Sequence, residues 1–326
     1  PGVLSMGDLR HYRVKERAAI CAPYRSYEVC GMGPPSSGAL SVGQILGLLN
    51  PFDLAALGAN SPESWRLIGD ASRLAFADRG QYMADSDFVP MPTKGLIDPA
   101  YLASRSALLR RDTALPEVAP GNPPFDHALN WSPDDSLELP STSHISIVDG
   151  FGNALSMTTT IENAFGSRLI TPSGYFLNNE LTDFSFRTHH EGVPIANRLE
   201  PGKRPRSSMA PTIVLKDGKP VMVLGSPGGS RIIGYVAKTI IAHLDWNLNI
   251  QAAIDLPHLI NRFGIYDLES GAVAETMTKP LAEALMSWDF EVKLRNLNSG
   301  IHAISLSLGQ LSGGADHRRE GIAIGE

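Results

Sequence analysis

The chain has 326 residues, of which 43% are hydrophobic and 19% are charged, proportions typical of a folded globular protein. Its formal net charge is -6 and it contains no run of Lys and Arg, so a nucleic-acid partner is not expected. No apolar run approaches the roughly 18 to 20 residues that a membrane-spanning helix needs. The length allows one large domain or two ordinary ones.

The chain has two cysteines, Cys21 and Cys30, and no second pair that would complete a zinc site. They are compatible with a disulfide or with two core thiols. The first residues, PGVLSMGDLR, lack the charged segment and following apolar segment of a signal peptide. We therefore expect no metal and no cofactor, and we assign no location from the sequence.

The first third of the chain is predicted to be mainly helical. A helix in GALSVGQILGLLN follows the turn PPSS, and a longer one begins at Ser61, an N-cap residue, with Pro62 in the first helical position. Its apolar face is formed by Trp65, Ile68, Ala71, Leu74 and Ala75. From Asp112 to Pro140 the sequence is rich in Pro and acidic residues and has no periodic pattern, which predicts a linker or an exposed loop.

After Thr142 the pattern is typical of β-structure. Two alternating segments, Ser143 to Asp149 and Asn153 to Thr159, predict a hairpin around the turn DGFG. A second hairpin is predicted over Asp217-Gly218, and IHAISLSLGQLSGG predicts a late strand pair. One helix is predicted from about Arg231 to Leu244, after the segment GSPGGS.

Several short motifs have both a structural and a functional interpretation. GSPGGSR lacks the ending of a phosphate-binding Walker loop, but adjacent glycine N–H groups at a helix start also suit an oxyanion hole. Taken alone, it is a tight turn. The segments THHE, RSSMAPT and LNNELTDFSF are each interpreted as loops when taken singly, and the hydroxyl residues of STSH are common at strand starts.

Taken in order, four segments resemble the γ-glutamyltransferase family of N-terminal nucleophile hydrolases, also called glutathione hydrolases. They are TSHISIVDGFGNALSMTTTIENAFGS, GYFLNNELTDFSF, KRPRSSMAPTIV and GSPGGSRII. The resemblance continues upstream through YRSYEVCGMGPPSSGAL and downstream to GGADHRREGIAIG. It implies an α/β (α+β) fold, the four-layer αββα sandwich, with two central and mostly antiparallel sheets flanked by helices.

The resemblance also implies self-cleavage. Thr142 would attack the carbonyl group of Ser141, and the cut would make Thr142 the first residue of a small subunit, 142–326. Residues 1–141 would be the carboxyl-terminal part of a large subunit. A threonine hydroxyl needs a base, and an N-terminal threonine carries its own α-amine, whose ordinary pKa is about 7.7 to 8.0.

The family's site residues carry over to positions of this sequence that match its motifs. Thr160 would orient the Thr142 hydroxyl, and Gly228 and Gly229 would supply oxyanion N–H groups. The substrate-binding residues would be Ser207 and Ser208 for the α-carboxylate, Glu180 and Asp183 for the α-ammonium group, and Glu162, which stands where many members have asparagine.

The implied activity is γ-glutamyl hydrolysis and transfer on glutathione-like compounds, through an ester on Thr142, to water, an amino acid or a dipeptide. One alternative is a cephalosporin-type or glutaryl-type acylase with the same nucleophile. Another is an unprocessed, inactive fragment that acts as an interaction module. We also expect the chain to lack the amino-terminal part of the large subunit, where the family places an arginine that pairs with the substrate carboxylate. The resemblance is compatible with a periplasmic or secreted protein.

Overall fold

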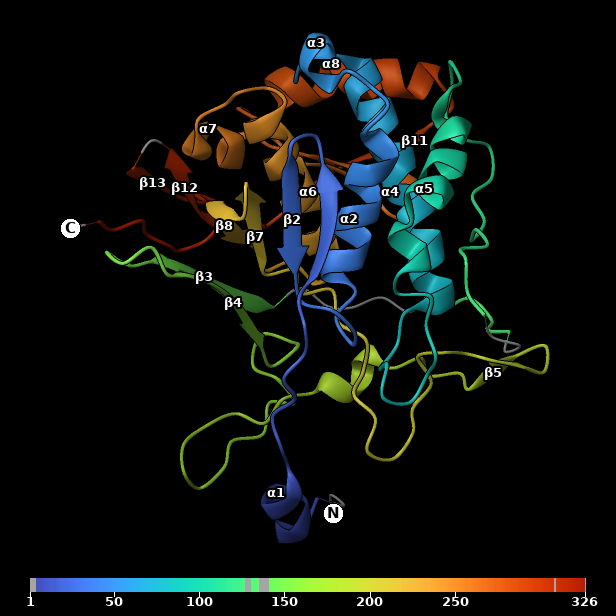
Figure 1. The fold of residues 1–326 in the computed structure, drawn as a ribbon, viewed down its shortest axis with the longest axis vertical. Coiled ribbons are helices and arrows are strands. Elements are labelled where there is room, and N and C mark those ends of the chain that lie inside the picture. The colour runs from blue at the N-terminus through green and yellow to red at the C-terminus, as the bar shows by residue number, and fades with distance from the viewer. Residues whose placement is uncertain (1–3, 127–129, 135–140, 308, 326) are drawn as a thin grey trace.

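The computed structural model describes residues 4–126, 130–134, 141–307 and 309–325, which form a mixed α/β fold (Figure 1). Its largest sheet has six strands in the order β1-β2-β7-β8-β12-β13, and all neighbouring strands are antiparallel. The strands are β1 (Ile20–Tyr24), β2 (Tyr27–Gly31), β7 (Thr212–Lys216), β8 (Lys219–Gly225), β12 (His302–Ser307) and β13 (Gln310–Ala315). The hairpin over Asp217-Gly218 and the late strand pair are therefore confirmed.

The β1–β2 hairpin is a difference from the sequence-based prediction, which made the first third of the chain mainly helical. Pro23 lies in β1, an edge strand, where a residue without a backbone N–H is tolerated. Cys21 lies opposite Cys30 across this hairpin, and the two form a disulfide with an S–S distance of 2.05 Å. Of the two states that the sequence allowed, the structure therefore has the disulfide.

The predicted helices are present. They are α2 (Gly38–Leu49), α4 (Pro62–Tyr82), which begins with Pro62 after the N-cap Ser61, and α6 (Ile232–Leu244). All residues of α2 are buried, and side chains from the three helices join strands of the large sheet in one hydrophobic core. The other helices are α1 (Met6–His11), α3 (Leu54–Leu57), α5 (Pro99–Ser106), α7 (Ile250–Asp255) and α8 (Glu275–Ser287).

Smaller elements complete the described fold. A three-stranded sheet contains β9 (Leu259–Asn261), β10 (Ile265–Glu269) and β11 (Glu291–Arg295), and a two-stranded one contains β5 (His189–His190) and β6 (Val193–Pro194). The 3-10 turns are η1 (Gly95–Ile97), η2 (Ala107–Leu109), η3 (Glu180–Asp183) and η4 (Gly229–Arg231). No helix among the described residues is both long and apolar enough to cross a bilayer.

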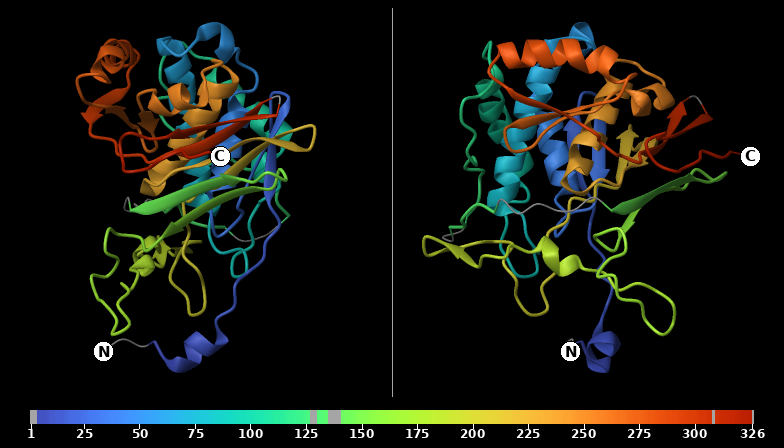
Figure 2. Two further views of the ribbon diagram at one scale, coloured as in Figure 1. Left: turned by 90° about the vertical axis from the view of Figure 1, so that its left-hand side faces the viewer. Right: turned by 180° about the vertical axis from the view of Figure 1, so that it is seen from behind.

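The predicted hairpin after the linker consists of β3 (Thr142–Val148) and β4 (Ala154–Thr160), with Thr142 directly opposite Thr160. In Figure 2 this green hairpin lies below the red strands, with the orange helices above them. Ser146 and Ser156 donate hydrogen bonds from the hairpin to the carbonyl oxygens of His302 and Leu224. The hairpin therefore packs against the large sheet near the start of β12 and the end of β8.

The two faces of this hairpin have an unusual polarity. The side toward the large sheet carries mainly Thr, Ser and His, with the pair Val148 and Ala154 next to the turn, whereas the outer side carries four large apolar residues in two cross-strand pairs. These pairs are Ile145 with Met157 and Ile147 with Leu155, and each side chain is 41 to 49% exposed. A surface hairpin ordinarily has the opposite pattern, with its apolar face inward.

The predicted linker, 112–140, lies partly outside the described residues. In its described parts, 112–126 and 130–134, the structure has no helix and no strand, and Ser132 forms an isolated bridge with Ile195.

Candidate active site

Thr142 and Thr160 face each other at the open end of the β3–β4 hairpin. The Thr142 hydroxyl donates to Oγ1 of Thr160 over 3.3 Å, and the Thr160 hydroxyl donates to the carbonyl oxygen of Ser141 over 2.6 Å. The backbone N–H of Glu162 in turn donates to Thr160 Oγ1 over 2.9 Å. The hairpin register therefore brings the Thr160 hydroxyl into hydrogen-bond contact with the carbonyl group of Ser141.

A small pocket of about 20 Å³ opens beside these threonines, enough for about one water molecule. Its lining includes seven of the nine catalytic and substrate-binding residues expected from the sequence. The lining residues are Thr142, Thr160, Glu162, Asp183, Ser207, Ser208, Met209, Gly229 and Ile232. Gly228 precedes Gly229 in the same turn. Glu180 lies at the start of η3, three residues before Asp183, and does not line this pocket.

Two acidic side chains enter the pocket from separate loops. Glu162 is 3% exposed and has a φ of 73°, a left-handed conformation that asparagine adopts more readily than glutamate. The side-chain amide of Asn179 donates to the Glu162 carboxylate. Asp183 ends η3 and is also buried. Both acidic residues therefore belong to the lining of the pocket.

The lining of the pocket also includes Ser207 and Ser208. The PPSS turn holds their loop in place, because the N–H of Ser37 donates to the Ser207 carbonyl over 2.8 Å. Arg79 of α4 donates to the Ser208 hydroxyl oxygen over 2.7 Å. Sequence analysis did not identify Arg79, although it lies four residues after Ala75 and so places a cation on the apolar face of a helix.

Gly228 and Gly229 form the turn between β8 and α6. Their φ angles are 141° and 57°, in the region that side chains disfavour, and a Cβ atom at Gly228 would lie 2.6 Å from the ring of Tyr235. The following η4 turn leads into α6, so the first N–H groups of this helical segment have no acceptor within the helix. Gly229 lines the same small pocket as Thr142.

His144 fixes the middle of β3 against the large sheet. Its Nδ1 lies 2.8 Å from the Thr158 hydroxyl and its Nε2 lies 3.0 Å from the Ser146 hydroxyl. The ring packs on the backbone of Gly225, where a Cβ atom would clash with it. Burial, together with nearby His302, lowers the pKa of His144 to about 3, so its imidazole is neutral at physiological pH.

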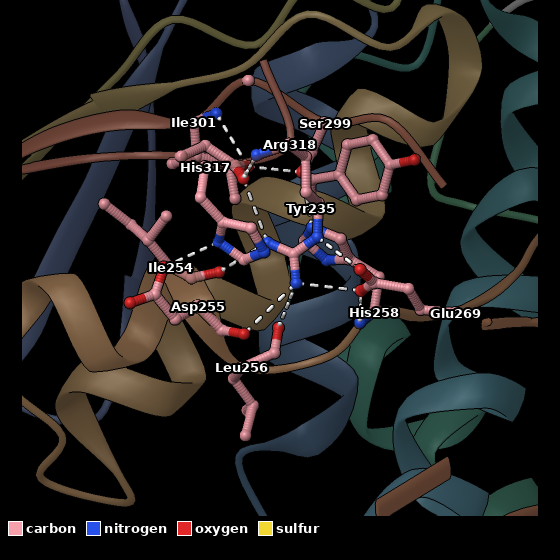
Figure 3. A network of polar contacts seen from close by, with 12 residues as sticks. Tyr235, Ile254, Asp255, Leu256, His258, Glu269, Ser299, Ile301, His317 and Arg318 are labelled. Atoms are coloured by element: carbon pink, nitrogen blue, oxygen red, sulfur yellow. Dashed lines mark hydrogen bonds and ion pairs between the residues drawn. The ribbon is translucent and has the colours of Figure 1, made fainter. Parts of the chain in front are cut away.

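Figure 3 shows a buried polar network around Arg318, the residue that precedes Arg319. Arg318 donates to the Glu269 carboxylate over 2.6 and 2.9 Å and to Asp316 over 3.0 Å. These ion pairs raise the Arg318 pKa, although its burial acts in the opposite direction. The next residue, Arg319, donates to the Thr142 carbonyl over 3.3 Å. Sequence analysis assigned no role to this segment, because only the fold brings it to the hairpin.

The paired histidines of THHE lie away from this site. His189 and His190 form the short, exposed strand β5. Among the residues that the structure describes, no three His, Cys, Asp or Glu side chains are grouped as a metal site.

The whole chain, residues 1–326, matches the family model described as γ-glutamyltranspeptidase. The glutathione hydrolase proenzyme of Bacillus subtilis (strain 168) is 35% identical over 99% of this chain and 55% of its own length. The Acylase ACY 1 proenzyme of Pseudomonas sp. (strain V22) is 32% identical over 99% of this chain and 54% of its own length. The chain therefore spans about half the length of these curated relatives.

Solved structures agree with this assignment. A cephalosporin acylase from Bacillus halodurans, 22% identical, superposes with a TM-score of 0.80 over 97% of this chain and 54% of its own, which is a likeness of fold. A γ-glutamyltranspeptidase from Pseudomonas nitroreducens, complexed with L-DON, is 31% identical, with a TM-score of 0.50 over 56% of this chain and 98% of its own. The chain belongs to the γ-glutamyltranspeptidase family.

Proposed function

We propose that this chain cleaves itself between Ser141 and Thr142 and then uses Thr142 to transfer or hydrolyse γ-glutamyl groups of glutathione-like compounds. One observation carries this proposal: the Thr160 hydroxyl donates to the Ser141 carbonyl beside the Thr142 hydroxyl, in the pocket that also contains Ser207, Ser208 and Asp183. A hydrogen bond to a carbonyl oxygen makes its carbon more electrophilic and stabilises negative charge that develops on the oxygen.

In the cleavage step, Thr142 Oγ1 forms a bond to the carbonyl carbon of Ser141 while the bond from that carbon to the Thr142 nitrogen breaks. The hydroxyl proton passes to the departing nitrogen. Water then hydrolyses the resulting ester, which leaves a carboxylate on Ser141 and a free amine and hydroxyl on Thr142.

In the transfer step, the free α-amine accepts the Thr142 hydroxyl proton as the oxygen attacks the γ-carbonyl of the substrate. The N–H groups of Gly228 and Gly229 would hold the developing oxyanion, and the proton then passes to the leaving amine. The γ-glutamyl ester on Thr142 is released to water or to the amine of an acceptor amino acid or dipeptide.

The substrate's two charged groups would bind to different side chains that line the pocket. The hydroxyls of Ser207 and Ser208 would bind the α-carboxylate, and the carboxylates of Asp183 and Glu162 would bind the α-ammonium group. We place Glu180 at the edge of the ammonium site, since it shares η3 with Asp183.

We further propose that residues 1–141 and 142–326 become the two subunits. The γ-glutamyltranspeptidase chain from Pseudomonas nitroreducens matches 56% of this chain. Residues 142–326 make up a similar fraction of it, which supports this division. The disulfide between Cys21 and Cys30 supports maturation in an oxidising compartment.

The four-layer αββα sandwich is also a proposal. The helices, the large sheet and the β3–β4 hairpin supply three successive layers. The apolar outer side of the hairpin, which includes Ile145 and Ile147, supports a fourth layer at that position. About half the length of the relatives lies beyond the matched part, enough polypeptide to form such a layer.

Replacement of Thr142 tests the main proposal. The Thr142→Ala chain should stay uncut and inactive, because alanine has no hydroxyl for either step, whereas Thr142→Ser should retain part of both activities. Ser143→Ala is a matched control, since Ser143 is the adjacent hydroxyl residue and is exposed. Intact-mass measurement and amino-terminal sequencing give the result. A Thr142→Ala chain that still splits before residue 142 would contradict the proposal.

The acylase relative supplies the second candidate function. The γ-glutamyl activity is favoured because Glu162 and Asp183, whose carboxylates can accept hydrogen bonds from an ammonium group, line the same pocket as Thr142, and a glutaryl group has no ammonium. Comparing kcat/KM for γ-glutamyl and glutaryl anilides separates the two activities. Preference for the glutaryl compound, unaffected by Asp183→Asn, would establish the acylase instead.

A further inference from the structure

Arg79 is a buried cation beneath the two serines of the pocket. It belongs to α4 and is 1% exposed. Its Nε donates to the Ser37 hydroxyl oxygen over 2.7 Å, and its Nη2 donates to the Ser208 hydroxyl oxygen over 2.7 Å. Arg79 is not among the residues that line this pocket, but it bonds to Ser208, which is.

The contact with Arg79 determines whether the Ser208 hydroxyl acts as a hydrogen-bond donor or acceptor toward the pocket. A guanidinium group has donors and no acceptor, so Ser208 Oγ must accept from it and cannot donate back. The O–H of Ser208 therefore remains to donate to another group. The Ser207 hydroxyl is also left to donate, since its Oγ accepts from the N–H of Met209 over 3.1 Å. Both hydroxyls are thus set to donate, as an anion requires.

Ser37 extends the influence of Arg79 to the second serine. While its oxygen accepts from Arg79, its hydroxyl donates to the Ser207 carbonyl over 2.8 Å. The Ser207 N–H donates in turn to the Pro35 carbonyl over 3.1 Å. One guanidinium therefore ties the PPSS turn and the Ser207-Ser208 loop into a single arrangement.

We propose that Arg79 is a positioning residue that holds the Ser208 hydroxyl as a donor to the substrate's α-carboxylate. This inference rests on the proposed function, because it takes that carboxylate as the ligand of the two serines. Arginine suits the position better than lysine, since its planar fork reaches two hydroxyl oxygens in fixed directions. Its charge, one hydrogen bond behind Ser208, also makes the potential at the hydroxyl more positive.

The test compares three ligands that differ only in their charged groups. L-Glutamate has both the α-carboxylate and the ammonium group, glutarate lacks the ammonium, and 4-aminobutyrate lacks the α-carboxylate. Binding to the self-cleaved protein is measured by calorimetric titration for the wild type and for Arg79→Lys. We expect Arg79→Lys to bind glutamate and glutarate roughly tenfold or more weakly, as for loss of an oriented bond to a charged group, and 4-aminobutyrate unchanged.

Two further variants serve as a control and as a substitute for Arg79→Lys. Arg66→Lys is the matched control, because Arg66 is another buried arginine of α4, is bonded to Glu63 and Leu109, and should bind all three ligands normally. If Arg79→Lys does not fold, Ser37→Ala removes one anchor of Arg79 and should weaken the same two ligands by a smaller factor.

The outcomes distinguish failure of the role proposed for Arg79 from failure of the proposed function. Equal weakening of all three ligands by Arg79→Lys would mean a general packing defect and would overturn the role of Arg79, as would unchanged binding. A wild-type protein that binds glutamate no better than 4-aminobutyrate would overturn the proposed function, and this inference with it.

Discussion

Thr160 contacts the peptide group that precedes Thr142, because the hairpin register places Thr160 directly opposite Thr142. Its hydroxyl oxygen lies 3.3 Å from Thr142 Oγ1, and it donates to the Ser141 carbonyl over 2.6 Å. The Glu162 N–H fixes its orientation by donating to it. A single side chain therefore contacts both the proposed nucleophile and the proposed electrophile.

Thr160→Ala should slow self-cleavage roughly a hundredfold, because the carbonyl loses a donor that is already in place. Thr160→Ser should cleave at a rate near that of the wild type. The control is Thr159→Ala, which removes the adjacent, exposed hydroxyl from the other side of β4. The rate is followed by denaturing gel after purification of the uncut chain. Equal rates for Thr160→Ala and Thr159→Ala would show that the Ser141 contact has no role in cleavage.

His144 predicts a pH dependence of stability. Its pKa falls from an ordinary value of 6.5 to about 3 in the folded chain, so the unfolded chain takes up this proton first as the pH falls. Stability from this group is complete above about pH 6.5 and is lost progressively toward pH 3. At pH 5 the loss is about 2 kcal/mol.

Urea unfolding at pH 7.5 and pH 5.0 measures this effect. The wild type should lose about 2 kcal/mol more than His144→Gln between the two values, because glutamine does not titrate. Other histidines, including buried His258, contribute to both proteins and cancel in the difference. The same pH dependence in both proteins would mean that His144 is not held neutral by the fold.

At the scale of elements, the sequence predicted what short-range patterns determine. The start of α4 followed from Ser61 and Pro62, and the β7–β8 hairpin followed from the Asp217-Gly218 turn. The β1–β2 hairpin was missed, because the turn at Arg25 and Ser26 lacks Gly or Asn and Pro23 interrupts the strand pattern. The motif residues of the pocket could be named from the sequence.

The supports of the pocket could not be predicted in the same way. Arg79 is 129 residues from Ser208, and Arg319 is 177 residues from Thr142. No local sequence pattern predicts which loop a buried arginine contacts, since that depends on how α4, the PPSS turn and the Ser207-Ser208 loop pack together. The polarity of the two hydroxyls likewise depends on partners that only the fold supplies.

The outer side of the β3–β4 hairpin gives a prediction for an element. Ile147→Thr should change the free energy of unfolding by less than about 0.5 kcal/mol, because this side chain is 49% exposed, and should reduce self-association and binding of a hydrophobic dye. Val214→Thr, on the buried strand β7, is the positive control and should cost about 1 to 3 kcal/mol. A comparable cost for Ile147→Thr would mean that this chain already covers its own hairpin.

At the scale of the whole molecule, the two proposed subunits share one sheet and one core. Strand β2 belongs to the first and β7 to the second, and the two are paired in register from Glu28 with Leu215 to Gly31 with Thr212. The main hydrophobic core likewise contains side chains from both. Separating the subunits would expose this core and break the pairing of β2 with β7 inside the sheet.

The subunits should therefore stay together after cleavage. Size-exclusion chromatography of the cut protein should give one peak that contains both fragments, and the fragments should separate only in denaturant. The uncut Thr142→Ala chain provides the reference volume. Two separate peaks under native conditions would show that the shared sheet and core do not hold the fragments together.

The contact of Thr160 with Ser141 also determines the molecularity of the cleavage. Both partners and the hydroxyl of Thr142 belong to one chain, so the proposed cleavage would be unimolecular and each chain would undergo it once. Its half-time should be the same after a hundredfold dilution of the protein. A wild-type chain mixed with Thr142→Ala should also leave the variant uncut, because the proposed cleavage joins groups of one and the same molecule; cutting of the variant in this mixture would contradict it.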